Sequence, residues 1–168
     1  MGKRSSELAS RFEHAVADFT KALEECSDAQ WAAICDAEGW TVGQTAQHVA
    51  GQFPLEMEFI IAAAEGKAMP AYTWDDVNSK NEGRAARNRA VTRVAVLQEL
   101  RAGAATTAAY LRGLNDEQLD RSGALSLADG ASVTAQQLIG GGVLIAHVTA
   151  HLESIRGALQ GSSSLIAR

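Results

Sequence analysis

The chain has 168 residues, with 15 Lys and Arg against 20 Asp and Glu, which gives a formal net charge of -5. Roughly 100 to 200 residues is the usual size of one domain, so we expect a single domain over 1–168. The acidic balance disfavours nucleic acids and anionic membranes as partners, because binding to either begins with a basic surface. The apolar share of 46% favours a packed core over intrinsic disorder.

Membrane-spanning and secretion signals are not expected. The longest apolar runs, at 59–64 and 143–146, are far shorter than the roughly 20 residues that span a bilayer. The first 14 residues contain no apolar stretch like that of a secretory signal. We therefore predict a cytoplasmic protein without a membrane partner. Cys26 and Cys35 do not form a CxxC motif, and we expect buried thiols.

The composition favours an all-α protein, since long stretches are rich in Ala, Leu, Glu, Gln and Arg and only two prolines occur. Leu8, Phe12, Phe19 and Leu23 lie at helical spacing and predict an amphipathic first helix over about 5–25. One apolar face of this helix should be buried against the rest of the chain.

The second helix is expected over about 41–65. Thr41 and Gln44 have the spacing of a capping box, in which each side chain binds the backbone N–H of the other residue. Pro54 lies inside this helix and lacks a backbone N–H, so we expect a kink or a local break near 52–53.

The second half of the chain contains two more long helices. Thr92 can cap a helix that reaches Gly113, and Thr134 with Gln137 repeats the capping-box spacing before a last helix that ends at about Gln160. Between these lie an irregular connection at 66–74, a charged helix at 75–90, a helical turn at 115–119 and a loop at 120–133. Four long helices and one long connection predict a four-helix bundle with a crossover between the second and third helices.

The last helix carries His147 and His151, four residues apart on one helical face. This spacing allows two imidazoles to bind one metal ion, although it also arises by chance. Zinc proteases of the HExxH type need Glu directly after the first His, and Val148 stands there. We therefore do not expect a metalloprotease.

His48 is the third candidate ligand, near the middle of the second helix. An inward side chain there would meet the last helix across the core, which is how bundles build metal sites. By itself His48 is better explained as a hydrogen-bonded core residue, but the three histidines together favour a metal site. We expect the fourth histidine, His14, to be a surface residue.

Three consecutive glycines, 140–142, lie inside the predicted last helix, where each costs about 1 kcal/mol relative to Ala. By helical geometry Gly140 falls on the face that carries His147 and His151. The run could leave space beside a metal for a substrate, or it could allow close packing or a local distortion. The sequence does not decide between these.

Four segments resemble the DinB-like superfamily of metal-binding four-helix bundles, which includes the metal-binding domain of mycothiol-dependent maleylpyruvate isomerase. They are GWTVGQTAQHVA at 39–50, DVNSKNEGRAARNR at 76–89, LQELRAGAATTAAYLRGLNDEQL at 97–119 and SVTAQQLIGGGVLIAHVTAHLESIRGAL at 132–159. The resemblance implies an up-down-down-up helix order and metal binding by His48, His147 and His151. It also favours a homodimer.

Three neutral imidazoles leave a divalent ion with an open coordination position, as in catalytic zinc sites. The first functional hypothesis is a metal-dependent enzyme that transfers a low-molecular-weight thiol to a small-molecule electrophile, with hydrolysis as a close variant. A non-catalytic metal-binding or stress-associated bundle is the alternative, and a metal-free dimerisation module is a third. Imidazole sites accept Zn, Ni or Fe, so the metal itself is not predicted.

Two further features are ambiguous. Gln52, one turn after His48, could bind a ligand, although a satisfied interior amide is the slightly better explanation. Arg84, Arg87, Arg89 and Arg93 could bind carboxylates of a thiol cofactor, but a run of this kind is more often a solvated helix face.

Overall fold

The computed structural model describes residues 2–166 and consists mainly of helices. The long helices are α1 (Lys3–Glu25), α3 (Val42–Glu65), α5 (Arg93–Gly113) and α8 (Ile145–Ile166), the last preceded by α7 (Ala135–Gly140). The shorter ones are α2 (Asp28–Trp31), α4 (Trp74–Arg87), α6 (Asp116–Asp120) and the 3-10 turn η1 (Ser126–Ala128). Two small antiparallel hairpins pair β1 (Ile34–Cys35) with β2 (Trp40–Thr41) and β3 (Ser122–Leu125) with β4 (Ala131–Thr134).

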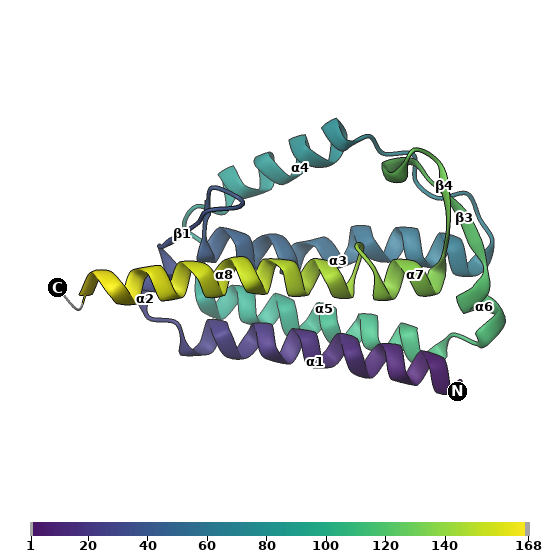
Figure 1. Cartoon of the computed structure of the whole chain (residues 1–168), viewed down its shortest axis with the longest axis horizontal. Helices are drawn as coiled ribbons and strands as arrows, with labels where there is room; N and C mark the ends of the chain where they lie inside the picture. Colours follow the sequence, from purple (N-terminus) through teal and green to yellow (C-terminus); the bar gives the residue numbers. More distant parts are fainter. Residues whose placement is uncertain (1, 167–168) are drawn as a thin grey trace.

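The long helices form a four-helix bundle in which α1 and α8 run one way while α3 and α5 run the other (Figure 1). This is the expected up-down-down-up order. Helix α1 packs against α5 and α8, and α3 packs against the same two helices. Helices α5 and α8 lie diagonally opposite each other. The connection from α3 to α5 returns along the length of the bundle through α4, which lies outside the bundle above α3 (Figure 1). The predicted fold class and crossover are therefore confirmed.

Capping residues set the helix starts at the places where the sequence predicts them. Thr41 Oγ1 accepts from the Gln44 backbone N–H at 3.1 Å, and Gln44 Oε1 accepts from the Thr41 N–H at 3.0 Å. Thr134 and Gln137 make the same pair of bonds at the start of α7. At its other end α3 closes on Gly66, whose φ of 68° is a left-handed conformation that favours glycine.

The core lies along the bundle axis, and every long helix contributes to it. The predicted apolar face of α1 is buried, including Phe12, which packs edge-to-face on Phe53 of α3 with 5.4 Å between ring centroids. Gly103 of α5 lies directly against the same Phe53 ring: a Cβ at that position would come within 2.8 Å of Cδ2. The missing side chain thus lets α5 approach α3 closely.

Three local features differ from the expectation. Helix α3 continues through Pro54 without the break that was one of the two alternatives expected near 52–53, because a proline removes only one backbone N–H and the buried face on both sides stays packed. The predicted loop at 120–133 contains the β3–β4 hairpin instead. The last helix is interrupted after Gly140 and then extends beyond Gln160 to Ile166, since adding residues to an existing helix is far easier than starting one.

Residues 135–161 have the length and apolar composition of a membrane-spanning helix, with a mean hydropathy of 1.4 in their most apolar window. This is weak support for a membrane span, because core helices of soluble proteins have the same properties. Here α8 packs against α1 and α3, and 39% of the window is buried within the bundle.

Replacing Gly103 with Ala should destabilise the protein by about 1–3 kcal/mol, because the new methyl group overpacks the Phe53 ring. An Ala in a helix normally stabilises relative to Gly, so the sign itself is informative. Urea unfolding monitored by circular dichroism measures the change. Gly157 of α8 is exposed with no atom within 4 Å of a built Cβ, and Gly157→Ala serves as the control that should be neutral or stabilising. Equal effects of the two substitutions would contradict the close approach.

Candidate metal centre

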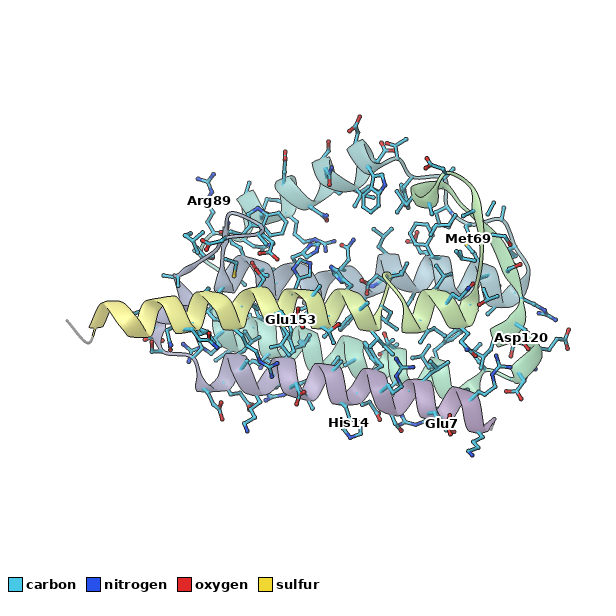
Figure 2. The ribbon with its side chains drawn as sticks, in the orientation of Figure 1. Glu7, His14, Met69, Arg89, Asp120 and Glu153 are labelled. Atoms are coloured by element: carbon cyan, nitrogen blue, oxygen red, sulfur yellow. The ribbon has the colours of Figure 1, made fainter. Side chains whose placement is uncertain are left out.

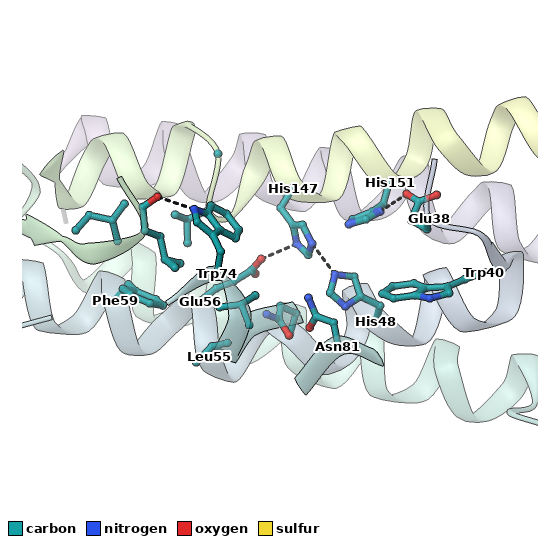
Figure 3. A pocket seen from close by; sticks show the side chains of 16 residues that line it. Glu38, Trp40, His48, Leu55, Glu56, Phe59, Trp74, Asn81, His147 and His151 are labelled. Carbon is teal, nitrogen blue, oxygen red and sulfur yellow. Dashed lines mark hydrogen bonds and ion pairs between the residues drawn. The ribbon is translucent and has the colours of Figure 1, made fainter. Parts of the chain in front are cut away.

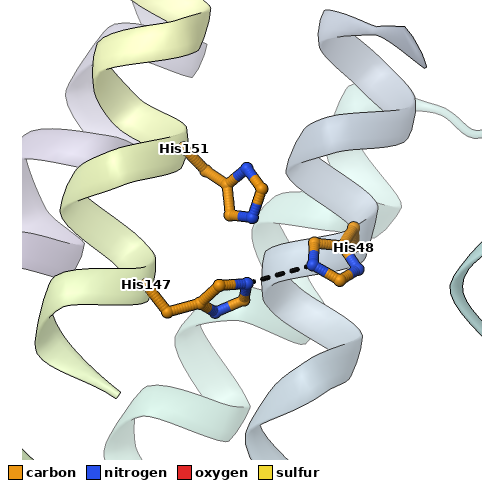
Figure 4. A group of neighbouring side chains, drawn as sticks. All are labelled: His48, His147 and His151. Carbon is orange, nitrogen blue, oxygen red and sulfur yellow. Dashed lines mark hydrogen bonds between the residues drawn. The ribbon is translucent and has the colours of Figure 1, made fainter. Parts of the chain in front are cut away.

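The three predicted histidines lie together between α3 and α8 (Figure 4). Nε2 of His48 is 3.0 Å from Nε2 of His147, and the candidate ligand atoms of all three residues lie within 4.8 Å of one another. His48 is 6% exposed, while His147 and His151 are partly buried. Residues about 100 positions apart in the chain thus form a cluster that could hold one metal ion.

Packing of α3 against α8 explains why this cluster forms. His147 and His151 stack one turn apart on α8, and His48 approaches them from the facing helix (Figure 4). The indole of Trp40, just before the cap of α3, packs edge-on against the His48 ring at 5.3 Å between centroids. The capping box at Thr41 therefore fixes both the start of α3 and the position of a ring that supports the site.

Glu38 orients His151. It lies in the turn between β1 and β2, and its Oε1 is 2.7 Å from Nδ1 of His151. Its second oxygen accepts a hydrogen bond from Ser154 Oγ at 2.5 Å. A carboxylate that holds Nδ1–H leaves the lone pair of Nε2 free to bind a metal, an arrangement common behind metal-binding histidines.

Glu56 plays the corresponding part behind His147. Its Oε1 lies 2.6 Å from Nδ1 of His147, although the N–H direction is not aligned for a regular hydrogen bond. The carboxyl group is buried in α3, two turns after His48, and its Oε2 has no partner among the described residues. Burial raises the pKa of Glu56, and the nearby His147 opposes this rise.

The electrostatic surroundings favour neutral imidazoles. Burial lowers the pKa of His48 to about 2, with further contributions from His147, His151 and Arg84. Burial and the neighbouring His147 also lower the pKa of His151. Neutral imidazole is the form that binds metals, so these rings are prepared for coordination at neutral pH.

The donor set fits a divalent transition metal. Imidazole nitrogens suit Zn, Ni and Fe, and a carboxylate oxygen lies 2.6 Å from Nδ1 of His147 and 2.7 Å from Nδ1 of His151. Three buried polar atoms of the cluster lack hydrogen-bond partners among the described residues: Nδ1 of His48, Nδ1 of His147 and Oε2 of Glu56. Such atoms are rare in protein interiors, and their concentration at one place indicates a functional site.

A cavity of about 330 Å³ opens directly onto the histidines (Figure 3). Its walls come from α3, from α4 on the outside, from the β3–η1 segment and from the start of α8. Trp74 at the start of α4 donates its indole N–H to the Leu127 carbonyl at 3.0 Å and so joins two of these walls. The crossover helix therefore forms part of the site.

The glycine run interrupts the helix that carries the histidines. Gly141 has a non-helical conformation, and a Cβ there would lie 2.5 Å from the Gln137 carbonyl oxygen. Gly142 and Val143, in the interruption, line the cavity. The prediction that Gly140 lies on the same helical face as His147 and His151 is wrong. Gly140 faces Leu8 and Arg11 of α1, because the interruption changes the helical register between Gly140 and the histidines. Both a distortion and a space beside the site are thus present.

The remaining candidates are placed as follows. His14 is exposed on α1 and points away from the bundle (Figure 2), as expected. Gln52 is buried, lines the cavity and accepts a hydrogen bond from Arg84. None of the four arginines considered above lines the cavity, and Arg89 points outward (Figure 2). Cys26 and Cys35 are buried free thiols.

Glu38 and Glu56 contact the histidines, and the sequence analysis did not identify either of them. Glu38 appears in the sequence only as part of a polar turn, and nothing local connects it with His151. Glu56 does carry a signal: it lies eight residues after His48, on the same helical face, and a carboxylate on a core-facing position calls for a partner.

Comparison with known proteins agrees with this geometry. The family model of the DinB superfamily matches residues 11–155. The chain belongs to the DinB superfamily. No curated protein matches the sequence.

Several solved structures share this fold. YfiT from Bacillus subtilis, described as "a probable metal-dependent hydrolase with an unusual four-helix bundle topology", is 20% identical with a TM-score of 0.74, over 97% of this chain and 90% of YfiT. Mycothiol-dependent maleylpyruvate isomerase is 16% identical with a TM-score of 0.71, and the match covers 90% of this chain but only 60% of the isomerase. The colibactin self-resistance protein ClbS, solved with double-stranded DNA, is 10% identical with a TM-score of 0.66, over 92% of this chain and 94% of ClbS.

The metal-free protein should lose stability on acidification through His48. Its pKa in the folded state, about 2, lies below the value of about 6.5 for an exposed imidazole, so the unfolded chain takes up the proton first. The contribution is complete above about pH 6.5 and is lost as the pH falls toward the folded-state pKa. Between about pH 6 and about pH 4, chelator-treated protein should lose about 1 kcal/mol per pH unit more than His48→Gln. Urea unfolding at each pH measures this, and parallel pH profiles would contradict it.

Proposed function

We propose that His48, His147 and His151 bind one divalent ion, Zn, Ni or Fe, through their Nε2 atoms. The support is the convergence of the three rings and the carboxylates behind two of them. The ion would supply Lewis acidity and lower the pKa of a water or thiol bound to it. Glu38 and Glu56 would keep the rings oriented and maintain the basicity of the ligand nitrogens.

We further propose that the protein is a metal-dependent enzyme of the thiol-transferase type, acting on a small-molecule electrophile. The observation that carries this proposal is the cavity, because a purely structural metal site would be closed by protein ligands. The histidines lie in one wall of a space large enough for an organic molecule. Trp74, Val77 and Asn81 of α4 bound this space on the side away from the bundle and would limit access of water to the reacting atoms.

Hydrolysis is the second candidate, since the likeness to YfiT covers most of both chains. The two reactions differ in the nucleophile, a low-molecular-weight thiol or water. We also propose a cytoplasmic location and a homodimer. The net charge of -5 supports a small-molecule substrate over a nucleic acid.

Metal analysis tests the ligand set. Purified or reconstituted protein should contain about one equivalent of Zn, Ni or Fe, and His48→Ala together with His151→Ala should lose it. His14→Ala, at the exposed histidine of α1, is the matched control and should retain the metal. Mass spectrometry of the desalted protein gives the stoichiometry. Protein that takes up no metal on reconstitution at neutral pH would overturn the proposal.

A panel of low-molecular-weight thiols with a generic electrophile tests the reaction. We expect a metal-dependent rate with at least one thiol that falls at least 100-fold in the double histidine variant and is unchanged in His14→Ala. A metal-dependent rate that does not require a thiol would identify the hydrolase. Full metal occupancy without turnover in either assay would favour the non-catalytic binding protein instead.

A further inference from the structure

The walls of the cavity are apolar apart from the side facing the histidines. The apolar wall residues are Trp40, Leu55, Phe59, Trp74, Val77, Leu125, Leu127 and Val143. Within the described part of the chain, no Lys or Arg lines the cavity. An occupant would therefore exchange water mainly for hydrocarbon and indole surface.

A carboxylate or phosphate group would find little compensation in these walls. Burying an anion without a paired cation is costly. The charged wall residues are Glu38 and Glu56, which repel an anion and are directed at His151 and His147. Arg84 is close, but its Nη1 donates to Gln52 Oε1 at 3.0 Å and the residue does not line the cavity. Apart from any metal ion, the cavity favours neutral molecules.

Two carboxamides remain to recognise a polar group. A guanidinium only donates hydrogen bonds, so the Gln52 atom that faces Arg84 must be the oxygen, which leaves the Gln52 –NH₂ free to donate. Asn81 of α4 lines the cavity, and its side chain makes no hydrogen bond with another described residue. Figure 3 shows its side chain directed from α4 toward the space beside His48 and Glu56. Both side chains line the same cavity, so each amide is a candidate donor to an oxygen of an occupant.

We propose that this cavity binds a neutral, largely apolar organic molecule with a carbonyl-type acceptor, and that Asn81 determines specificity by donating to that acceptor, with help from Gln52. The acceptor would then lie on the same side of the cavity as the histidines, and the apolar body would lie between Trp74, Phe59 and Leu127. The cavity volume of about 330 Å³ is within the range of pockets that bind small organic molecules. The expected binding preference is independent of the proposed function. Only the suggestion that the bound molecule is the substrate rests on it.

Tryptophan fluorescence provides the assay, because Trp40 and Trp74 line the cavity and Trp31 does not. The full chain, metal-loaded and chelator-treated, is titrated with 4-phenylbutanamide and with 4-phenylbutanoate, which differ only in the polar group. In the chelator-treated protein the amide should reach half-saturation at a concentration at least 10-fold lower than the carboxylate. Equal or tighter binding of the carboxylate would overturn the proposal, as would no saturable binding of the amide.

Asn81→Leu separates recognition from simple burial. It should weaken binding of the amide about 5- to 10-fold, the effect of one lost neutral hydrogen bond. Binding of butylbenzene, which has no acceptor, should be unchanged or tighter, which shows that the cavity is intact. Asn78→Leu, at an exposed position of the same helix, is the matched control and should change neither affinity. Unchanged amide affinity in Asn81→Leu would overturn the role of this residue.

The two proposals can fail separately. Amide binding in protein that takes up no metal would refute the proposed metal site and leave the binding preference of the cavity established. Metal uptake together with a preference for the carboxylate in the chelator-treated protein would support the metal site and refute the binding preference of the cavity.

Discussion

The burial of three imidazoles between α3 and α8 is the constraint on which the rest of this structure depends. Their nitrogens lie within 4.8 Å of one another, and burial lowers the pKa of His48 to about 2. Two charged rings would repel one another at this distance, and burial disfavours the charged forms of His48 and His151, so the cluster suits neutral imidazoles that share an ion. Glu38 and Glu56 fit this requirement because they approach the distal nitrogens of two rings and leave the Nε2 atoms facing inward.

Several parts of the chain that depart from a simple bundle contribute to the surroundings of this cluster. The β1–β2 turn supplies Glu38, the interruption after Gly140 supplies Gly142 and Val143, and α4 crosses outside the bundle to supply Asn81. A regular bundle would close the core over the histidines. The crossover and the helix interruption instead leave a cavity with apolar walls beside the histidines, of a size that fits an organic molecule.

The sequence predicted much of the fold because the relevant signals are local. The capping boxes at Thr41 and Thr134 start helices in the structure, and the buried face of α1 follows directly from its periodicity. Errors arose where distant contacts outweigh local preference. Pro54 is tolerated within the packed α3, and residues 122–134 form a hairpin although their composition is that of a loop. The register change at Gly141 turned Gly140 toward α1, which no periodic projection could anticipate.

The sequence by itself determined the all-α class, the helix starts and the three candidate ligands, because periodicity, capping and the i, i+4 spacing of His147 and His151 operate within a few residues. Only the tertiary structure decided that His48 meets them, that Glu38 and Glu56 stand behind them, and that no arginine within 2–166 lines the cavity. These facts depend on which helices pack together and at what register. Such packing is set by the whole core at once, and no short segment of the chain carries it.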